Sequence, residues 1–128
     1  MPCGVFDWHI ENNGESDIEL SLMFTWQSGS ASDKFNLTDV SSKSFENYKQ
    51  FNTEMTGVVL DQKLNGIPFQ YCIAAKKSNN VHVSYNCQFY PNKEKSGKML
   101  WKDLESDGKL NNQQCININI EYLHVIYI

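Results

Sequence analysis

Apolar side chains at every second position are the strongest constraint that this sequence places on its fold. Successive side chains of a β-strand point to opposite faces of a sheet, so this period is typical of strands with one buried face. Two such runs precede residue 27, and the Asn13-Gly14 pair between them predicts a hairpin. Because both apolar sets fall on even positions, pairing them requires an odd-length loop or a bulge. The first set is Phe6, Trp8 and Ile10, and the second is Ile18, Leu20, Leu22, Phe24 and Trp26.

A second pair of alternating runs lies between residues 69 and 89, with its apolar side chains on odd positions. An odd loop at residues 78–80 predicts a hairpin in which Ile73 faces Tyr85 and Tyr71 faces Cys87. The runs consist of Phe69, Tyr71, Ile73 and Ala75, followed by Val81, Val83, Tyr85, Cys87 and Phe89.

The remaining segments predict less regular structure. Residues 27–54 are rich in Ser, Asn, Asp, Lys and Thr without a sustained period, so we expect a long surface loop. Residues 57–60 predict a short buried strand that ends at Asp61. Residues 99–107 predict a short helix, closed by Asp107-Gly108, that caps an edge of the sheet.

The tail alternates again at Ile116, Ile118, Ile120 and Tyr122, so it is expected to form a strand that promotes aggregation if nothing pairs with it. With the hairpins, these elements predict an all-β fold: a partial antiparallel β-sandwich with one long loop and one short helix.

Length and charge exclude several classes of function. The chain has 128 residues, 41% of them hydrophobic, which fits one domain. Its 11 basic and 15 acidic residues give a net charge of -4, so we expect no nucleic-acid partner. No run approaches the roughly 20 apolar residues of a membrane helix, and residues 1–4 lack the features of a signal peptide. We therefore expect no transmembrane segment and no secretion.

The cysteines and histidines predict neither a bridge within the second hairpin nor a metal site. The predicted register places Cys72 and Cys87 on opposite faces, so both are expected to be reduced thiols. The four cysteines include no C-x-x-C pair, and each of the three histidines is isolated. We expect no metal and no other cofactor.

Two acidic groups and the three tryptophans invite functional hypotheses, but each is better explained by structure. Asp7, His9 and Glu11 alternate along one strand face, and we interpret them as its solvent side rather than as a metal or acid-base site. The acidic residues Asp103, Glu105 and Asp107 are expected to be a solvated helix flank. Of the tryptophans, Trp8 and Trp26 are in phase with the apolar faces, which favours core packing over a sugar-stacking platform, whereas Trp101 stays open.

Three stretches resemble the N-terminal domain of the non-lysosomal glucosylceramidases, also called bile-acid β-glucosidases, of glycoside hydrolase family 116. The first reads Gly-Val-Phe-Asp-Trp-His-Ile-Glu-Asn at residues 4–12 and continues to Leu-Met-Phe at residues 22–24. The others are Gly-Val-Val-Leu at residues 57–60 and Trp-Lys-Asp-Leu-Glu-Ser-Asp-Gly-Lys-Leu at residues 101–110. Their order and spacing also match, so the resemblance covers residues 2–110.

The resemblance implies a β-sandwich that partners a helical catalytic barrel, which carries the Glu nucleophile and Asp acid/base of a retaining β-glucosidase. No catalytic residue of the family can be carried onto this sequence, so we assign no catalytic, cofactor-binding or metal-binding residue. The family hydrolyses glucosylceramide, in glycolipid catabolism, at the cytosolic face of ER and Golgi membranes. The chain is therefore expected to be an inactive accessory fragment of such an enzyme.

The resemblance also implies how the chain is divided. The family has further strands before the position of Pro2, so the chain is expected to begin within the domain. Residues 1–112 are assigned to a partial sandwich domain and residues 113–128 to an atypical strand-like tail. The alternative is a free-standing β-sandwich module that binds carbohydrates or proteins.

Overall fold

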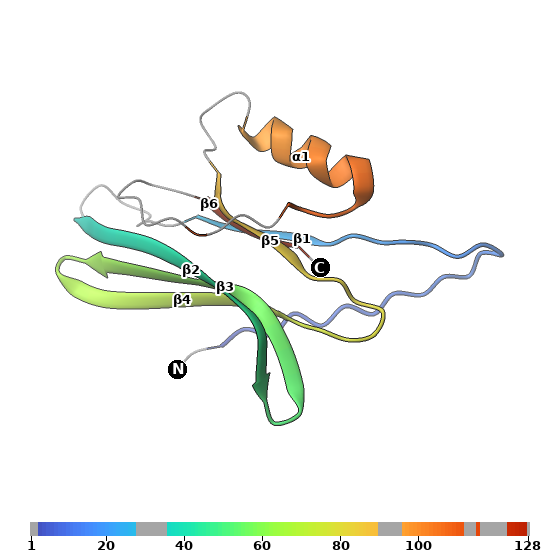
Figure 1. Ribbon diagram of the computed structural model, residues 1–128, viewed down its shortest axis with the longest axis horizontal. Coiled ribbons are helices and arrows are strands. Elements are labelled where there is room, and N and C mark those ends of the chain that lie inside the picture. The colour runs from blue at the N-terminus through green and yellow to red at the C-terminus, as the bar shows by residue number, and fades with distance from the viewer. Residues whose placement is uncertain (1–2, 28–35, 90–95, 112–114, 116–122, 128) are drawn as a thin grey trace.

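The computed structural model describes residues 3–27, 36–89, 96–111, 115 and 123–127. Its elements are β1 (Met23–Gln27), β2 (Leu37–Gln50), β3 (Thr53–Leu64), β4 (Ile67–Lys76), β5 (Ser84–Phe89), α1 (Ser96–Asp107) and β6 (Leu123–Tyr127). The strands form two three-stranded antiparallel sheets, in the orders β1-β6-β5 and β2-β3-β4. Figure 1 shows the β1-β6-β5 sheet between α1 and the β2-β3-β4 sheet. The predicted all-β class with one short helix is confirmed.

The main hydrophobic core lies between the two sheets. Val58 and Leu60 of β3 are fully buried, and they share one cluster with Tyr85 and Cys87 of β5. Within the run that leads into β5, Val83, Tyr85 and Cys87 are buried, as the period predicts. Strand residues 57–60 also lie where they were predicted, although β3 is much longer than that segment.

A smaller cluster fixes α1 against β5, an edge strand of its sheet. Leu100 and Leu104 of the helix pack on Leu110, and the Leu110 amide donates to Ser84 Oγ at 2.9 Å. The helix ends as predicted, since Gly108 has a positive φ of 70° and its amide donates to the Leu104 carbonyl. No helix in the described part of the chain is long and apolar enough to cross a membrane.

The prediction of a long loop at residues 27–54 is wrong wherever this segment is described. β2 spans residues 37–50 and pairs with β3, with irregularities between Thr38 and Ser41 and between Phe45 and Tyr48. Asp39 and Asn47 have positive φ at these points, as bulge residues often do. Each bulge shifts the phase of the strand, and a serine occupies one of its buried positions, Ser42. The strand therefore has no sustained apolar period, while residues 28–35 lie outside the described residues.

The predicted hairpin of residues 69–89 is also wrong, although both of its strands exist. β4 pairs with β3, so that Ile73 faces Val58 and Tyr71 faces Leu60, while Tyr85 of β5 faces Ile126 of β6. The chain crosses from one sheet to the other between β4 and β5, and the two runs contribute to the same core from opposite layers. Alternation fixes which face is buried, but it does not name the partner strand.

The pairing of β3 with β4, which the sequence analysis does not predict, has a clear turn signal in the sequence. The β3–β4 hairpin turns at Asn65-Gly66, where φ is 52° and 79°, as a tight two-residue turn requires. The β2–β3 hairpin turns at Phe51-Asn52, with φ of 48° and 62°. Phenylalanine is an unusual residue for this conformation, so the second turn could not be expected from its sequence.

Residues 3–22 form an extended arm without helix or strand, here called the N-terminal arm. Its tip folds as the predicted turn: Asn12 Nδ2 donates to the Ser16 carbonyl at 2.7 Å, and the Gly14 amide donates to Asn12 Oδ1 at 2.9 Å. Figure 1 shows both limbs running out to this tip and back to β1. The predicted strand at residues 6–10 does not form, and the second strand is reduced to β1. Neither limb lies in a ladder with another strand, so their apolar faces stay uncovered.

The predicted tail contributes a central strand. β6 pairs with β1 on one side and β5 on the other, so its backbone is satisfied on both edges. The alternating residues 116–122 lie outside the described residues. The boundary at residue 112 stays a prediction.

Candidate functional site

The acidic clusters predicted from the sequence lie on the surface and are not brought together. His9 Nε2 is 3.1 Å from Glu11 Oε1, and both side chains are exposed. Asp103 accepts hydrogen bonds from the Asn111 amide at 3.0 Å and the Asn111 side chain at 2.6 Å, so it fastens the segment after α1. Among the described residues, no three His, Cys, Asp or Glu side chains form a group that could hold a metal ion.

The tryptophans are more exposed than the sequence predicts. Trp8 is 62% exposed and Trp26 is 39% exposed, so the expectation that both pack in the core is wrong. Trp101, for which the sequence favours neither role, is 57% exposed on α1. The physical reason is that Trp8 lies on the arm, which has no facing sheet, and Trp26 lies on β1, an edge strand.

Trp26 belongs to a row of aromatic rings that joins the arm, β1 and β4. Successive ring centroids are 5.3 Å apart from Phe6 to Phe24, 6.2 Å to Trp26, 5.6 Å to Tyr71 and 4.3 Å to Phe69. These spacings lie in or near the range in which aromatic pairs attract each other. We call these five residues the aromatic row.

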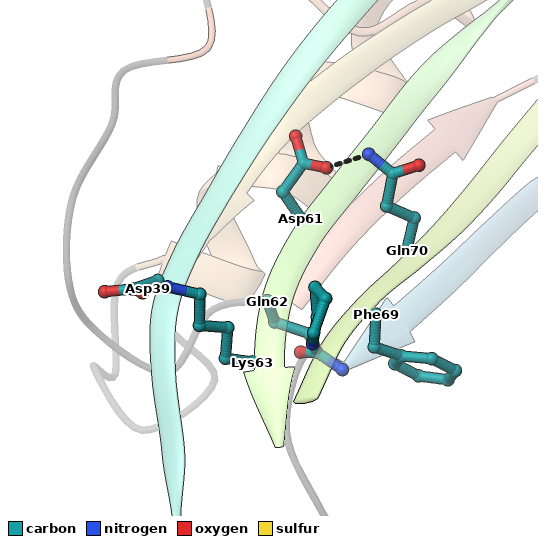
Figure 2. Close-up of a pocket in the computed structure, with 7 residues that line it drawn as sticks. Asp39, Asp61, Gln62, Lys63, Phe69 and Gln70 are labelled. Carbon is teal, nitrogen blue, oxygen red and sulfur yellow. Dashed lines mark hydrogen bonds and ion pairs between the residues drawn. The ribbon is translucent and has the colours of Figure 1, made fainter. Parts of the chain in front are cut away.

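An open hollow lies at the Phe69 end of the aromatic row. Its volume is about 510 Å³, and its walls are Asp39 of β2, Asp61, Gln62 and Lys63 of β3, and Pro68, Phe69 and Gln70 of β4. Figure 2 shows Asp61 and Gln70 joined across the two strands and the Phe69 ring directed away from them. Because neighbouring positions alternate between the two faces, the hollow wraps around β4, an edge strand.

The charged groups at the hollow are paired. Lys63 Nζ lies 2.6 Å from Asp39 Oδ2, and Lys43 Nζ lies 3.1 Å from Asp61 Oδ2. Burial raises the pKa of Asp61, but hydrogen bonds from Gln70 and Lys43, with the charge of Lys43, hold it below its usual value. Asp61 is therefore ionised at neutral pH, the opposite of what a catalytic acid needs.

Gln62 is the unusual member of the hollow. It is 3% exposed, and its Oε1 has no hydrogen-bond partner in the part of the chain that the structure describes. A buried acceptor without a donor costs about 1–3 kcal/mol. The sequence held a signal for this site, because Gln62 continues the buried alternation of Val58 and Leu60 with a polar side chain.

The cysteines depart from the prediction at one position. Cys87 is bonded to Cys115 across a Cα–Cα distance of 5.3 Å, so the expectation of a reduced Cys87 is wrong. Cys72 is free, as predicted, and so is Cys3. Cys115 follows the helix and lies in no alternating run, so nothing in the pattern placed it beside β5.

The chain matches a known protein family. The chain matches the family described as beta-glucosidase 2, glycosyl-hydrolase family 116 N-term, over residues 1–121. The match extends past residue 110, where the three resembling stretches end. No solved structure matches the chain.

Proposed function

The chain belongs to the N-terminal domain family of glycoside hydrolase family 116, and we propose that its enzyme is a β-glucosidase that hydrolyses glucosylceramide. The chain is accordingly an accessory domain of a glycoside hydrolase, and a catalytic domain is its partner. The family match over residues 1–121 is the observation that carries the proposal. We propose that the helical barrel implied by the sequence resemblance performs the hydrolysis and that this domain supports the barrel.

The carboxylates of the hollow support a non-catalytic role. Retaining hydrolysis of a glycoside uses two carboxyl groups about 5–5.5 Å apart, one of them with a raised pKa. Asp39 and Asp61 are each ion-paired with a lysine, and the pKa of Asp61 is lowered. Neither group has the environment of a glycosidase acid.

The N-terminal arm supports a role in which another domain covers this one. Its large apolar side chains are exposed to an unusual degree: Val5 85%, Phe6 68%, Trp8 62%, Ile18 57%, Leu20 52% and Ile10 51%. Exposed large apolar side chains that are concentrated on one segment favour an interaction surface, and burying one such side chain contributes about 1.5–3 kcal/mol. We assign the catalytic domain as the partner that covers the arm.

The proposed location is the cytosolic face of ER and Golgi membranes. The resemblance to the glucosylceramidases supports it. The Cys87–Cys115 bond argues for an oxidising compartment instead, because disulfides are rare in the cytosol. Because Cys87 is buried in the folded chain, alkylation during denaturing lysis of cells decides between them. The proposed location requires Cys87 and Cys115 to be labelled without a reductant, and labelling of both only after reduction would contradict it.

Co-purification with the catalytic domain, expressed as a separate chain, tests the assignment of the arm. Trp8→Ser should weaken the association, whereas Trp101→Ser, a change at a similarly exposed tryptophan on α1, should leave it intact. Equal retention of the two variants would refute the arm as the interface. The substrate is tested on the full enzyme, which should hydrolyse glucosylceramide faster than galactosylceramide, and the reverse order would contradict the proposal.

A further inference from the structure

We propose that the chain forms a symmetric dimer through β4, whose free edge pairs antiparallel with β4 of a second copy. The two β2-β3-β4 sheets then join into one continuous sheet across a twofold axis. This inference goes beyond the proposed function, which names only the catalytic domain as a partner, and it does not depend on that function.

β4 is the least protected edge strand in the described part of the chain. Sheet edges expose unpaired backbone groups, and proteins shield them with short strands, bulges, charged residues or a covering helix. β1 is only five residues long, and α1 is fixed beside β5. β2 is interrupted by bulges at Asp39 and Asn47 and carries charged residues along its length. β4, by contrast, is ten residues long and pairs with β3 without a register shift.

The sequence of β4 also favours pairing with another strand. Pro68 and Lys76, the residues that would discourage pairing, lie near its two ends. Between them, residues 69–75 read Phe-Gln-Tyr-Cys-Ile-Ala-Ala and contain no charge, proline or glycine. An uncharged run of this length with high β-propensity is typical of segments that pair edge to edge. The long free edge of β4 is therefore a template for a further strand.

The backbone groups that β4 leaves unpaired follow from its ladder with β3, the only strand beside it in the described part of the chain. The Lys77 amide donates to the Glu54 carbonyl at 2.9 Å, next to the last pair of the β3–β4 register. Because alternate residues of an antiparallel strand bond to the same neighbour, the odd positions of β4 bond to β3 and the even positions point outward. Pro68 is an even position and has no amide hydrogen. The outward amides are those of Gln70, Cys72, Ala74 and Lys76.

These outward groups are self-complementary. When two β4 strands run antiparallel about a twofold axis at Ile73, Cys72 lies opposite Ala74 of the partner subunit. In the same register, Gln70 lies opposite Lys76 of the partner subunit. Each outward amide then meets an outward carbonyl, as the hydrogen-bonded pairs of an antiparallel ladder require.

The position of Pro68 selects this register. A twofold axis at Cys72 would place Pro68 opposite Lys76 of the partner subunit. The Lys76 carbonyl would then have no donor, because proline lacks an amide hydrogen. With the axis at Ile73, Pro68 stays outside the shared ladder.

The side chains also fit in this register. On the face toward the core, Tyr71 lies opposite the partner's Ala75, so a large side chain meets a small one. Ile73 lies opposite its own copy, and both Tyr71 and Ile73 are only partly buried within one chain. The dimer therefore covers further apolar surface, which favours association. Lys76 lies opposite an uncharged residue, Gln70, so no like charges face each other.

Size-exclusion chromatography with light scattering, over a range of chain concentrations, tests the proposal. The chain should pass from monomer to dimer as its concentration rises. Cys72→Pro removes one outward amide from each copy and no hydrogen bond of the β3–β4 ladder, so the dissociation constant should rise about tenfold or more. The matched control is Cys72→Ala, which removes the thiol but keeps the amide, and it should dimerise as the original protein does.

Amide hydrogen exchange of the unaltered chain gives a second readout that needs no variant. Raising the concentration through the monomer–dimer range should slow exchange at the even positions from Gln70 to Lys76. The amides at the odd positions of β4 bond to β3 in both states, so their exchange should not change. This alternation distinguishes strand pairing from other modes of association, and it decides the question if Cys72→Pro fails to fold.

Several results would overturn the dimer. One is a chain that stays monomeric at the highest concentration, and another is a folded Cys72→Pro protein that dimerises like the original. A dimer that is lost in Trp8→Ser but kept in Cys72→Pro would assign the association to the N-terminal arms. A dimer abolished by Cys72→Ala would show a disulfide between the copies instead of strand pairing. Binding of the catalytic domain is measured separately, so either proposal can fail while the other holds.

Discussion

Replacing Gly57 by alanine should destabilise the domain, although alanine is usually the better residue inside a strand. Gly57 lies in β3, the central strand of its sheet, directly opposite Ala74 of β4. A Cβ at this position would lie 2.2 Å from the Ile73 carbonyl oxygen and 2.8 Å from the Ala74 Cα. Both are backbone atoms, so no side-chain rotation can relieve the clash.

The magnitude follows from how far β4 must move. Restoring a contact of about 3.2 Å to the Ile73 oxygen requires a shift of roughly 1 Å, which strains the flanking ladder hydrogen bonds. Overpacking of this kind costs about 1–3 kcal/mol, and each weakened hydrogen bond costs up to about 1 kcal/mol. Subtracting the usual gain of about 0.5–1 kcal/mol for Gly→Ala leaves a net loss of about 1–3 kcal/mol.

Urea denaturation followed by circular dichroism measures this loss as a lower midpoint. Gly97→Ala is the matched control, because Gly97 lies in the first turn of α1 and a Cβ there meets nothing within 4 Å. That variant should gain about 0.5–1 kcal/mol. A Gly57→Ala protein as stable as the original, or more stable, would refute the pairing of β3 with β4 at this register.

Three further predictions follow from single contacts. Reducing the Cys87–Cys115 bond, which spans 28 residues, should lower stability by about 3–4 kcal/mol. In the oxidised protein, alkylation after unfolding should label two cysteines before reduction and four after it. The pKa of Asp61 is lowered from 3.8. The ionised Asp61 carboxylate therefore stabilises the fold above pH 3.8, and this stabilisation is lost as the pH falls through the folded-state pKa. Asp61→Asn should therefore flatten the acid limb of a stability-against-pH curve. Tyr85 donates to Glu46 Oε1 at 2.8 Å. Burial, together with Glu46, raises the pKa of Tyr85 above 10.0. The contribution of Tyr85 to stability is therefore complete below pH 10.0 and is lost as the pH rises through the folded-state pKa. Tyr85→Phe should lose about 1–3 kcal/mol at neutral pH and remove this alkaline dependence, as urea midpoints at pH 7 and about pH 11 would show.

Sequence period identified the buried faces correctly where a strand is regular and its partners are apolar. Val83, Tyr85 and Cys87 are buried as the period predicts, although Ser84 and Asn86 between them are buried too. Leu100 and Leu104 share the packed side of α1. The structure of these elements follows from the pattern of residues within each element. The arm shows the limit of this reasoning, because its period is equally clear but no strand lies beside it.

The pairing of the strands and the position of the candidate site depend on contacts between segments that are distant in the sequence. β2 escaped prediction because bulges at Asp39 and Asn47 break its phase. The bond to Cys115 joins a strand to a segment without period, so only the three-dimensional arrangement brings the two cysteines together. The hollow draws its walls from three strands, yet Gln62, in phase with buried neighbours, was a local signal that could have pointed to it.

Hydrolysis of a fluorogenic β-glucoside, measured in parallel for this chain and for the full enzyme, tests whether this domain is non-catalytic. We expect turnover by the full enzyme and none by the folded chain, even at high protein concentration. Turnover by the chain that scales with its concentration and disappears in Asp61→Asn would contradict the assignment of a non-catalytic accessory domain.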